Sequence, residues 1–296
     1  MKTPVFTGSS VAIVTPFYPD GSVNYDKLKE LIDFHIENGT SAITICGTTG
    51  ESATMTIAEH VEVIDFTVKY ANKRITVIAG SGSNDTMAAL EISKEAEKSR
   101  ADALLMVTPY YNKATQKGLI LHYNYIADRV NTPIILYHVP SRTGCSFTAE
   151  TYKELSRHPM INGVKEASGN FALLTRTIAE CGDELNVWSG NDDEVVPMMA
   201  LGAKGVISVL ANVAPRVVVD MTQACLAGDF KAGAALQLKY FDLIKKLFIE
   251  VNPIPVKAAM NLMGMNVGGN RLPLCDMEED NLEKLKLSMQ KVGLIR

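Results

Sequence analysis

Short runs of apolar, β-branched residues recur along this chain, and each is followed by a longer stretch with apolar residues at helical spacing. Because the short runs are almost continuously hydrophobic, they are typical of parallel strands that are covered on both faces. This alternation predicts a parallel sheet built from strand–helix units. The predicted strands are Ser10–Phe17, Ala42–Gly47, Ile75–Gly82, Ala103–Pro109, Pro133–Pro140, Ile161–Ser168, Leu185–Gly190 and Gly205–Asn212.

The longer stretches predict helices, and Thr56-Ile57-Ala58-Glu59 has the pattern of a capping box that opens one of them. The other helices between the strands are predicted over Asn24–Gly39, Asp85–Arg100, Gln116–Val130, Ala149–His158, Phe171–Cys181 and Glu194–Leu201. After the last predicted strand the pattern is purely helical, over Pro215–Gly228, Phe230–Glu250, Pro255–Met263 and Glu278–Val292.

Eight strands that are each followed by a helix predict an α/β fold, a (β/α)8 TIM barrel with a C-terminal helical appendage. We expect the barrel over residues 1–228 and the helical region, packed on the barrel, over residues 229–296. An open doubly wound sheet is the competing fold. It is disfavoured because no GxGxxG motif follows the first strand, and Gly264–Gly269 has the wrong glycine spacing.

Composition excludes several classes of protein. Hydrophobic residues make up 47% and charged residues 21% of the 296 residues, which is ordinary for a globular protein. A net charge of -4 argues against a nucleic-acid partner, which needs a basic face. No apolar run approaches the ~20 residues of a membrane span, and the N-terminus lacks an apolar signal core. The five scattered cysteines support no disulfide framework, so we expect a cytoplasmic protein.

The sequence offers no support for a metal or cofactor site. The five cysteines are far apart and form no CxxC pair, and the histidines show no ligand spacing such as HxxxH. No glycine-rich phosphate cradle occurs, so we expect a substrate without a phosphate group.

Lys165 is the most informative residue, because it is the only lysine within the apolar core of a predicted strand. In a barrel the active site lies at the carboxyl ends of the strands, and a lysine that faces the interior there is desolvated. Desolvation favours the neutral amine, which attacks carbonyl groups and forms Schiff bases. A structural pair with Glu166 is the alternative, but neighbouring strand residues face opposite sides of the sheet.

Other side chains at strand ends have both a functional and a structural interpretation. Tyr137 could move protons near an amine, or it could be a core tyrosine whose hydroxyl is satisfied. The Thr48-Thr49 turn could hold a carboxylate, or it could be an ordinary tight turn. Arg142 could clamp a substrate carboxylate, or it could be a solvated surface arginine.

Two further patterns give rival or structural hypotheses. Cys46 ends the second predicted strand and His138 the fifth, so a Cys–His nucleophile pair is possible, although a free cysteine is more often a small buried hydrophobe. The acidic run Asp192-Asp193-Glu194 is expected to cap the N-terminus of the helix that follows it.

Together these motifs resemble the dihydrodipicolinate synthase family, also called 4-hydroxy-tetrahydrodipicolinate synthases. That family belongs to a wider group of pyruvate-dependent class I aldolases that includes N-acetylneuraminate lyase. The likeness runs from Val14-Thr15-Pro16-Phe17 through Asn252–Lys257 to Arg271-Leu272-Pro273-Leu274. Thr48, Tyr111 and Arg142 look like the synthase branch of the group.

The resemblance implies a lyase of the diaminopimelate and lysine pathway that condenses pyruvate with L-aspartate 4-semialdehyde and needs no cofactor. Lys165 would form a Schiff base with pyruvate, and Tyr137, Thr48 and Tyr111 would form a proton relay. The residue that matches Tyr111 reaches in from a neighbouring subunit, so the resemblance implies a homotetramer whose minimal active unit is a dimer.

The resemblance also assigns the residues that would bind the substrates. The Thr48-Thr49 turn would hold the pyruvate carboxylate, and Arg142 would bind the carboxylate of the semialdehyde. Gly190 and Ile207 match backbone positions that line the family's pocket.

The chain departs from the family pattern in two places. His138 stands where the family commonly has asparagine. Ile57 and Ala88 stand where members that are inhibited by lysine carry histidine and glutamate, so we expect weak or absent lysine feedback. The remaining positions of that feedback site match, and they are Ser52, Ala53, His60, Asn84 and Tyr110.

Three rival functions remain. The first is a related aldolase, like N-acetylneuraminate lyase, that acts on another aldehyde or keto acid. The second is a barrel that binds a keto acid without turnover, and the intact set of Lys165, Tyr137 and Thr48 disfavours it. The third is a structural or assembly protein, for which the sequence offers no positive feature.

Overall fold

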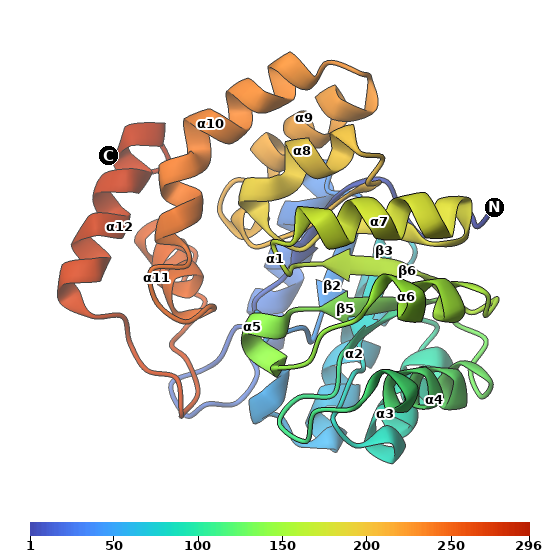
Figure 1. Cartoon of the computed structure of the whole chain (residues 1–296). Helices are drawn as coiled ribbons and strands as arrows, with labels where there is room; N and C mark the ends of the chain where they lie inside the picture. The colour runs from blue at the N-terminus through green and yellow to red at the C-terminus, as the bar shows by residue number, and fades with distance from the viewer.

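The strands close into a barrel in the order in which they occur along the chain, with every pair of neighbours parallel. The computed structural model describes residues 1–296, and Figure 1 shows the strands at its centre. The strands are β1 (Gly8–Ala12), β2 (Ala42–Ile45), β3 (Thr76–Gly80), β4 (Ala103–Val107), β5 (Ile134–His138), β6 (Ile161–Glu166), β7 (Asn186–Ser189) and β8 (Gly205–Ser208). The predicted (β/α)8 TIM barrel is therefore confirmed.

Helices connect the strands and continue beyond the last one. Between the strands lie α1 (Tyr25–Glu37), α2 (Ile57–Ala71), α3 (Thr86–Lys98), α4 (Gln116–Ala127), α5 (Pro140–Thr143), α6 (Ala149–Ser156), α7 (Phe171–Cys181) and α8 (Val195–Ala200). After β8 come α9 (Pro215–Leu226), α10 (Phe230–Lys246), α11 (Ile254–Leu262) and α12 (Glu279–Val292). Single 3-10 turns are η1 (Ser52–Thr54), η2 (Gly182–Glu184), η3 (Asp192–Glu194) and η4 (Leu210–Asn212).

Half of the predicted capping box on α2 forms. Thr56 caps the helix, since its hydroxyl accepts a hydrogen bond of 3.2 Å from the backbone N–H of Glu59. The carboxylate of Glu59 binds the guanidinium of Arg271 instead of turning back to the start of its own helix. The second half of the motif is thus used to attach the C-terminal region.

Every strand ends before the end that we predicted for it, and β1 also begins earlier. The apolar runs continue past the ends of the strands because the loops that follow are buried too. Ile13 and Val14 after β1, and Val209 and Leu210 after β8, are all buried. Hydrophobicity therefore marks burial at these positions, whereas the hydrogen-bonded strand stops where the chain turns toward the mouth of the barrel.

The side chains of the strands divide into two apolar clusters. A cluster of 12 buried residues fills the barrel and includes Ile78, Tyr137, Trp188 and Ile207. The larger cluster, of 68 buried residues, lies between the strands and the surrounding helices. This division follows from the alternation of strand side chains, and it places Tyr137 and Lys165 inside while their neighbours face the helices.

The segment before β1 closes the amino end of the barrel. The ring of Phe6 stacks on Trp188 with 5.1 Å between the ring centroids, and the indole N–H donates to the carbonyl of Phe6 over 3.2 Å. The ammonium of Lys2 donates to the carbonyl groups of Ser156, His158 and Ile161. The active site must therefore use the opposite, carboxyl end.

The helices α10, α11 and α12 form the C-terminal helical region, which lies to one side of the barrel (Figure 1). We propose that the boundary between the barrel and this region lies at residues 228 and 229, in the turn between α9 and α10. No helix in the structure has the length and apolar character needed to cross a membrane.

Truncation of Phe6 to alanine should lower the free energy of unfolding by about 3 kcal/mol or more, because it removes a buried ring from the amino end of the barrel. Urea unfolding followed by circular dichroism measures the change. Leu238→Ala is the control, since that side chain is 72% exposed and its loss should alter stability little. Equal effects of the two changes would contradict this account of the barrel end.

Candidate active site

A cavity of about 170 Å3 opens at the carboxyl ends of the strands, and we call it the central cavity. Six of the residues that the sequence singled out line it: Thr48, Thr49, Tyr137, Arg142, Lys165 and Gly190. The other lining residues include Thr44, Ser141, Asn191, Val209, Phe248 and Asn252. The predicted site residues therefore meet in one place, at the end of the barrel where TIM barrels carry their active sites.

Lys165 lies on β6 with only 6% of its surface exposed. It stands opposite Tyr137 of β5 in the strand register, and its Nζ is 4.4 Å from the centroid of the tyrosine ring. Glu166 faces the helices and binds His138, so the alternative in which Lys165 pairs with Glu166 is wrong. An amine held against a phenol ring and away from its neighbouring carboxylate is suited to attack a carbonyl group.

Gly190 allows the chain to pass close to this lysine. A Cβ atom at that position would lie 2.7 Å from Cβ of Ala167 and 3.1 Å from Cε of Lys165. The backbone N–H of Gly190 donates to the carbonyl of Glu166 over 2.7 Å. A larger residue there would displace the lysine or fill the cavity beside it.

The Thr48-Thr49 turn follows β2 and is held by residues from the C-terminal region. Thr49 is buried, and its hydroxyl accepts a hydrogen bond of 2.9 Å from the side-chain amide of Asn252. Two residues further on, the buried carboxylate of Glu51 lies 2.8 Å from Nζ of Lys257 and accepts the backbone N–H of Arg271 over 3.0 Å. Burial lowers the pKa of Lys257, and the neighbouring Glu51 opposes that effect.

Arg142 lies on α5, a short helix where we expected a loop. Its guanidinium reaches Asn252, whose backbone carbonyl accepts from Nη2 over 3.4 Å. The side chain is exposed and lines the central cavity, so it is available to a ligand that enters from solvent.

Asn252 is the site residue that the sequence reasoning missed. It lies in the turn between α10 and α11, and it links the Thr48-Thr49 turn with Arg142. Its Oδ1 is buried and has no hydrogen-bond partner, which leaves an acceptor free at the edge of the cavity. The only sign of Asn252 in the sequence is that it begins one of the motifs shared with the family. The rule that barrel sites lie at the carboxyl ends of strands cannot find it, because it lies between two C-terminal helices.

Two predicted residues lie outside the cavity of their own chain. Tyr111 is 91% exposed, and its backbone φ of 69° lies in the left-handed region. Ile207 is fully buried on β8 among the residues that fill the barrel. Neither side chain is among those that line the central cavity.

The structure rejects two other hypotheses from the sequence. The thiol of Cys46 lies 3.8 Å from the carbonyl of His60, burial raises its pKa, and His138 binds Glu166, so no Cys–His pair forms. Asp192 does not cap the helix that follows it, because its carboxylate accepts from Ser208 Oγ and from the backbone N–H groups of Val209 and Leu210. Burial raises the pKa of this carboxyl, and those hydrogen bonds oppose the effect.

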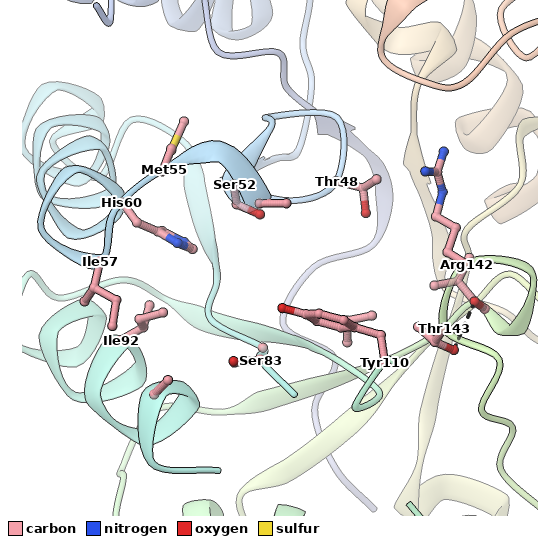
Figure 2. Close-up of a pocket in the computed structure, with 15 residues that line it drawn as sticks. Thr48, Ser52, Met55, Ile57, His60, Ser83, Ile92, Tyr110, Arg142 and Thr143 are labelled. Carbon is pink, nitrogen blue, oxygen red and sulfur yellow. Dashed lines mark hydrogen bonds between the residues drawn. The ribbon is translucent and has the colours of Figure 1, made fainter. Parts of the chain in front are cut away.

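A second cavity of about 470 Å3 adjoins the first, and we call it the outer cavity. Thr48, Val139 and Arg142 line both cavities. Figure 2 shows Thr48 and Arg142 at one end of it and Ile57 and Ile92 at the other. The feedback positions found in its lining are Ser52, Ala53, Ile57, His60, Ala88 and Tyr110, and no lining residue carries a carboxylate.

The model of the dihydrodipicolinate synthetase family matches residues 5–292. The chain belongs to that family. A curated 4-hydroxy-tetrahydrodipicolinate synthase from Thermoanaerobacter sp. (strain X514) is 54% identical to it, over 99% of both chains.

Solved structures of dihydrodipicolinate synthases agree with this membership. That of Aquifex aeolicus is 46% identical and has a TM-score of 0.96, covering 98% of this chain and 99% of its own. That of Acinetobacter baumannii, described as chloride inhibited and complexed with pyruvate, is 43% identical with a TM-score of 0.96, covering 98% and 100%. The resemblance that we inferred from the motifs is therefore confirmed over the whole synthase fold.

Replacement of Lys257 by methionine should lower the free energy of unfolding by about 3–5 kcal/mol, because the buried carboxylate of Glu51 would lose its charged partner. Chemical denaturation measures the loss. The double variant Lys257→Met, Glu51→Met should be more stable than the single one, since it removes both charges. A double variant with the summed loss of the two single variants would show that the pair is not coupled.

Proposed function

We propose that this family member condenses pyruvate with L-aspartate 4-semialdehyde to give 4-hydroxy-tetrahydrodipicolinate, and that Lys165 carries the reaction. The observation that carries the assignment to Lys165 is its buried amine, 4.4 Å from the ring of Tyr137 in a cavity that also contains a threonine turn and an arginine. The names of the full-length relatives support the reaction itself, as does the pyruvate complex of the Acinetobacter baumannii enzyme.

The first step joins pyruvate to the lysine. The neutral amine of Lys165 attacks the C2 carbonyl, and loss of water leaves an imine. The hydroxyl and backbone N–H groups of the Thr48-Thr49 turn donate hydrogen bonds to the pyruvate carboxylate. Asn252, which already binds the hydroxyl of Thr49, keeps this turn in place.

The second step forms the new carbon–carbon bond. Removal of a proton from the methyl group of the imine gives an enamine, which attacks the aldehyde carbon of the semialdehyde. Tyr137 and Thr48 carry protons to and from the reacting atoms. Arg142 binds the carboxylate of the semialdehyde, and attack of that substrate's amine on the imine then closes the ring and releases Lys165.

We also propose that the site is completed by a second copy of the chain. Tyr111 is the third member of the proton relay, and its 91% exposure on its own chain leaves it free to enter a neighbouring site. A dimer is then the smallest active unit, and we propose a homotetramer built from two of them.

Gly190 and the backbone at Ile207 complete the substrate pocket. The family's biosynthetic role favours the cytoplasm as the location.

The competing activity is that of a related aldolase such as N-acetylneuraminate lyase. The relatives that cover 99% of this chain are named as synthases, and they favour the condensation with the semialdehyde. Thr48 and Arg142, which mark the synthase branch of the resemblance, both lie at the central cavity and favour the same choice. The proposed mechanism uses only protein side chains and the two substrates.

The direct test is turnover of pyruvate with L-aspartate 4-semialdehyde, coupled to a reductase that oxidises a nicotinamide cofactor. The wild-type protein should turn over, and Lys165→Ala should lose that turnover because no amine remains to form the imine. A panel of other aldehydes is the control for substrate choice. Turnover that persists in Lys165→Ala would exclude this lysine, and turnover only with another aldehyde would exclude the substrate.

Arg142→Ala should weaken the step that uses the semialdehyde and leave formation of the pyruvate adduct nearly unchanged, because the guanidinium binds the second substrate. Loss of one hydrogen bond to a charged group corresponds to about 10-fold or more in kcat/KM for the semialdehyde. Borohydride trapping of the pyruvate adduct gives the matched measurement. An equal fall in both steps would rule out a role confined to the semialdehyde.

L-Lysine should inhibit weakly or not at all, because the outer cavity offers its ammonium group no carboxylate. Steady-state rates at increasing lysine concentration test this directly. The double variant Ile57→His, Ala88→Glu restores the residues of the lysine-sensitive members and should make inhibition stronger. Sub-millimolar inhibition of the wild-type protein would contradict the expectation.

A further inference from the structure

A buried polar cluster lies behind the central cavity, on the outer face of the two strands that carry Tyr137 and Lys165. His138 and Glu166 stand opposite each other in the register, one residue beyond the pair of site residues. The histidine is fully buried and the glutamate is 4% exposed. Nδ1 of His138 lies 3.0 Å from each oxygen of the Glu166 carboxylate, so the two side chains bridge β5 and β6.

Three donors, one from α6 and two from the backbone of loops, complete the cluster. The hydroxyl of Tyr152 on α6 donates to the Glu166 carboxylate over 3.1 Å, and the backbone N–H of Ser168 donates to it over 2.8 Å. The backbone N–H of Phe147 donates to Nε2 of His138 over 3.4 Å. Since Nε2 accepts a hydrogen bond, these contacts assign the ring hydrogen to Nδ1, which donates to the carboxylate.

This bridge fixes the strands at the level of the reacting groups. Tyr137 and His138 are consecutive residues on β5, and Lys165 and Glu166 are consecutive on β6. The hydrogen bond between the two side chains that face the helices therefore limits how far the phenol and the amine inside the barrel can move apart. Backbone bonds beside the bridge, from Ala167 to the carbonyl of His138 and from Gly190 to that of Glu166, extend the same constraint to the next strand.

We propose that His138 and Glu166 are positioning residues that hold the phenol of Tyr137 at the distance from Lys165 that proton transfer requires. The proposal rests on the proposed role of Lys165 as the pyruvate-binding amine. It gives a function to the histidine that replaces the family's common asparagine. Because a misplacement of about 1 Å can cost about 100-fold in rate, a bridge outside the cavity can control a step inside it.

The test separates binding of pyruvate from the proton transfer that follows. In His138→Phe an aromatic ring still fills the site and the donor to Glu166 is lost. Borohydride should still trap the pyruvate adduct, and the KM for pyruvate should stay near the wild-type value. Exchange of the pyruvate methyl hydrogens in D2O, followed by NMR, should slow about 10-fold or more. His138→Asn, which keeps a donor, should restore most of the exchange rate.

His35→Phe is the matched control, because it also replaces a fully buried histidine that has one side-chain partner, Thr40, but on α1 away from the cavity. It should lower thermal stability without slowing exchange. If His138→Phe does not fold, Glu166→Met tests the same bridge from the other strand, because it removes both acceptor oxygens. Exchange at the wild-type rate in a folded bridge variant would overturn the proposal, as would equal slowing in His35→Phe.

A double-mutant cycle with Tyr137→Phe decides whether the histidine acts through the tyrosine. Once the phenol is gone, His138→Phe should slow exchange by much less than it does in the wild-type background. If His138→Phe slowed exchange by the same factor with and without the phenol, the proposed action through Tyr137 would be overturned. The exchange assay uses pyruvate alone, so it remains informative if condensation with L-aspartate 4-semialdehyde fails, whereas absence of any pyruvate adduct would reject the role of Lys165 itself.

Discussion

The register between β5 and β6 determines which side chains meet at the candidate site. With Tyr137 opposite Lys165, the phenol and the amine share the interior of the barrel, while His138 and Glu166 face the helices. A shift of β6 by one residue would exchange Lys165 and Glu166 between the two faces, because strand side chains alternate between the faces of a sheet. The amine would then lie among the helices and the carboxylate of Glu166 would face the interior, so the cavity would lose the group on which the chemistry depends.

The C-terminal helical region is part of the site as well as of the fold. Asn252 from this region binds Thr49 and Arg142, and the buried ion pair of Lys257 and Glu51 anchors the chain just after the same turn. The cavity is thus assembled from strand ends and from a segment about 90 residues later in the chain than Lys165. This arrangement explains why barrel and appendage pack as one unit around the threonine turn.

The sequence predicts the strand order, the helices and most of the lining, because these depend on local periodicity and on the rule that barrel sites lie at strand ends. It could not predict Asn252, whose role arises from a contact across the whole chain. It also placed Asp192 wrongly, because the carboxylate binds backbone N–H groups of the turn after β8, which lie next to it in space and not in sequence. The ends of the strands were overestimated because buried loops are as apolar as strands.

Two lysines are buried near this end of the barrel, and they differ in their partners. Lys257 is bound to Glu51 and to the carbonyl groups of Thr15 and Gly269, whereas Lys165 rests on the ring of Tyr137. The most direct test is to reduce the protein with borohydride in the presence of pyruvate and to map the modified peptide by mass spectrometry. We expect modification at Lys165 with Lys257 unmodified, and modification at Lys257 or at no lysine would contradict the role of Lys165 as the pyruvate-binding amine.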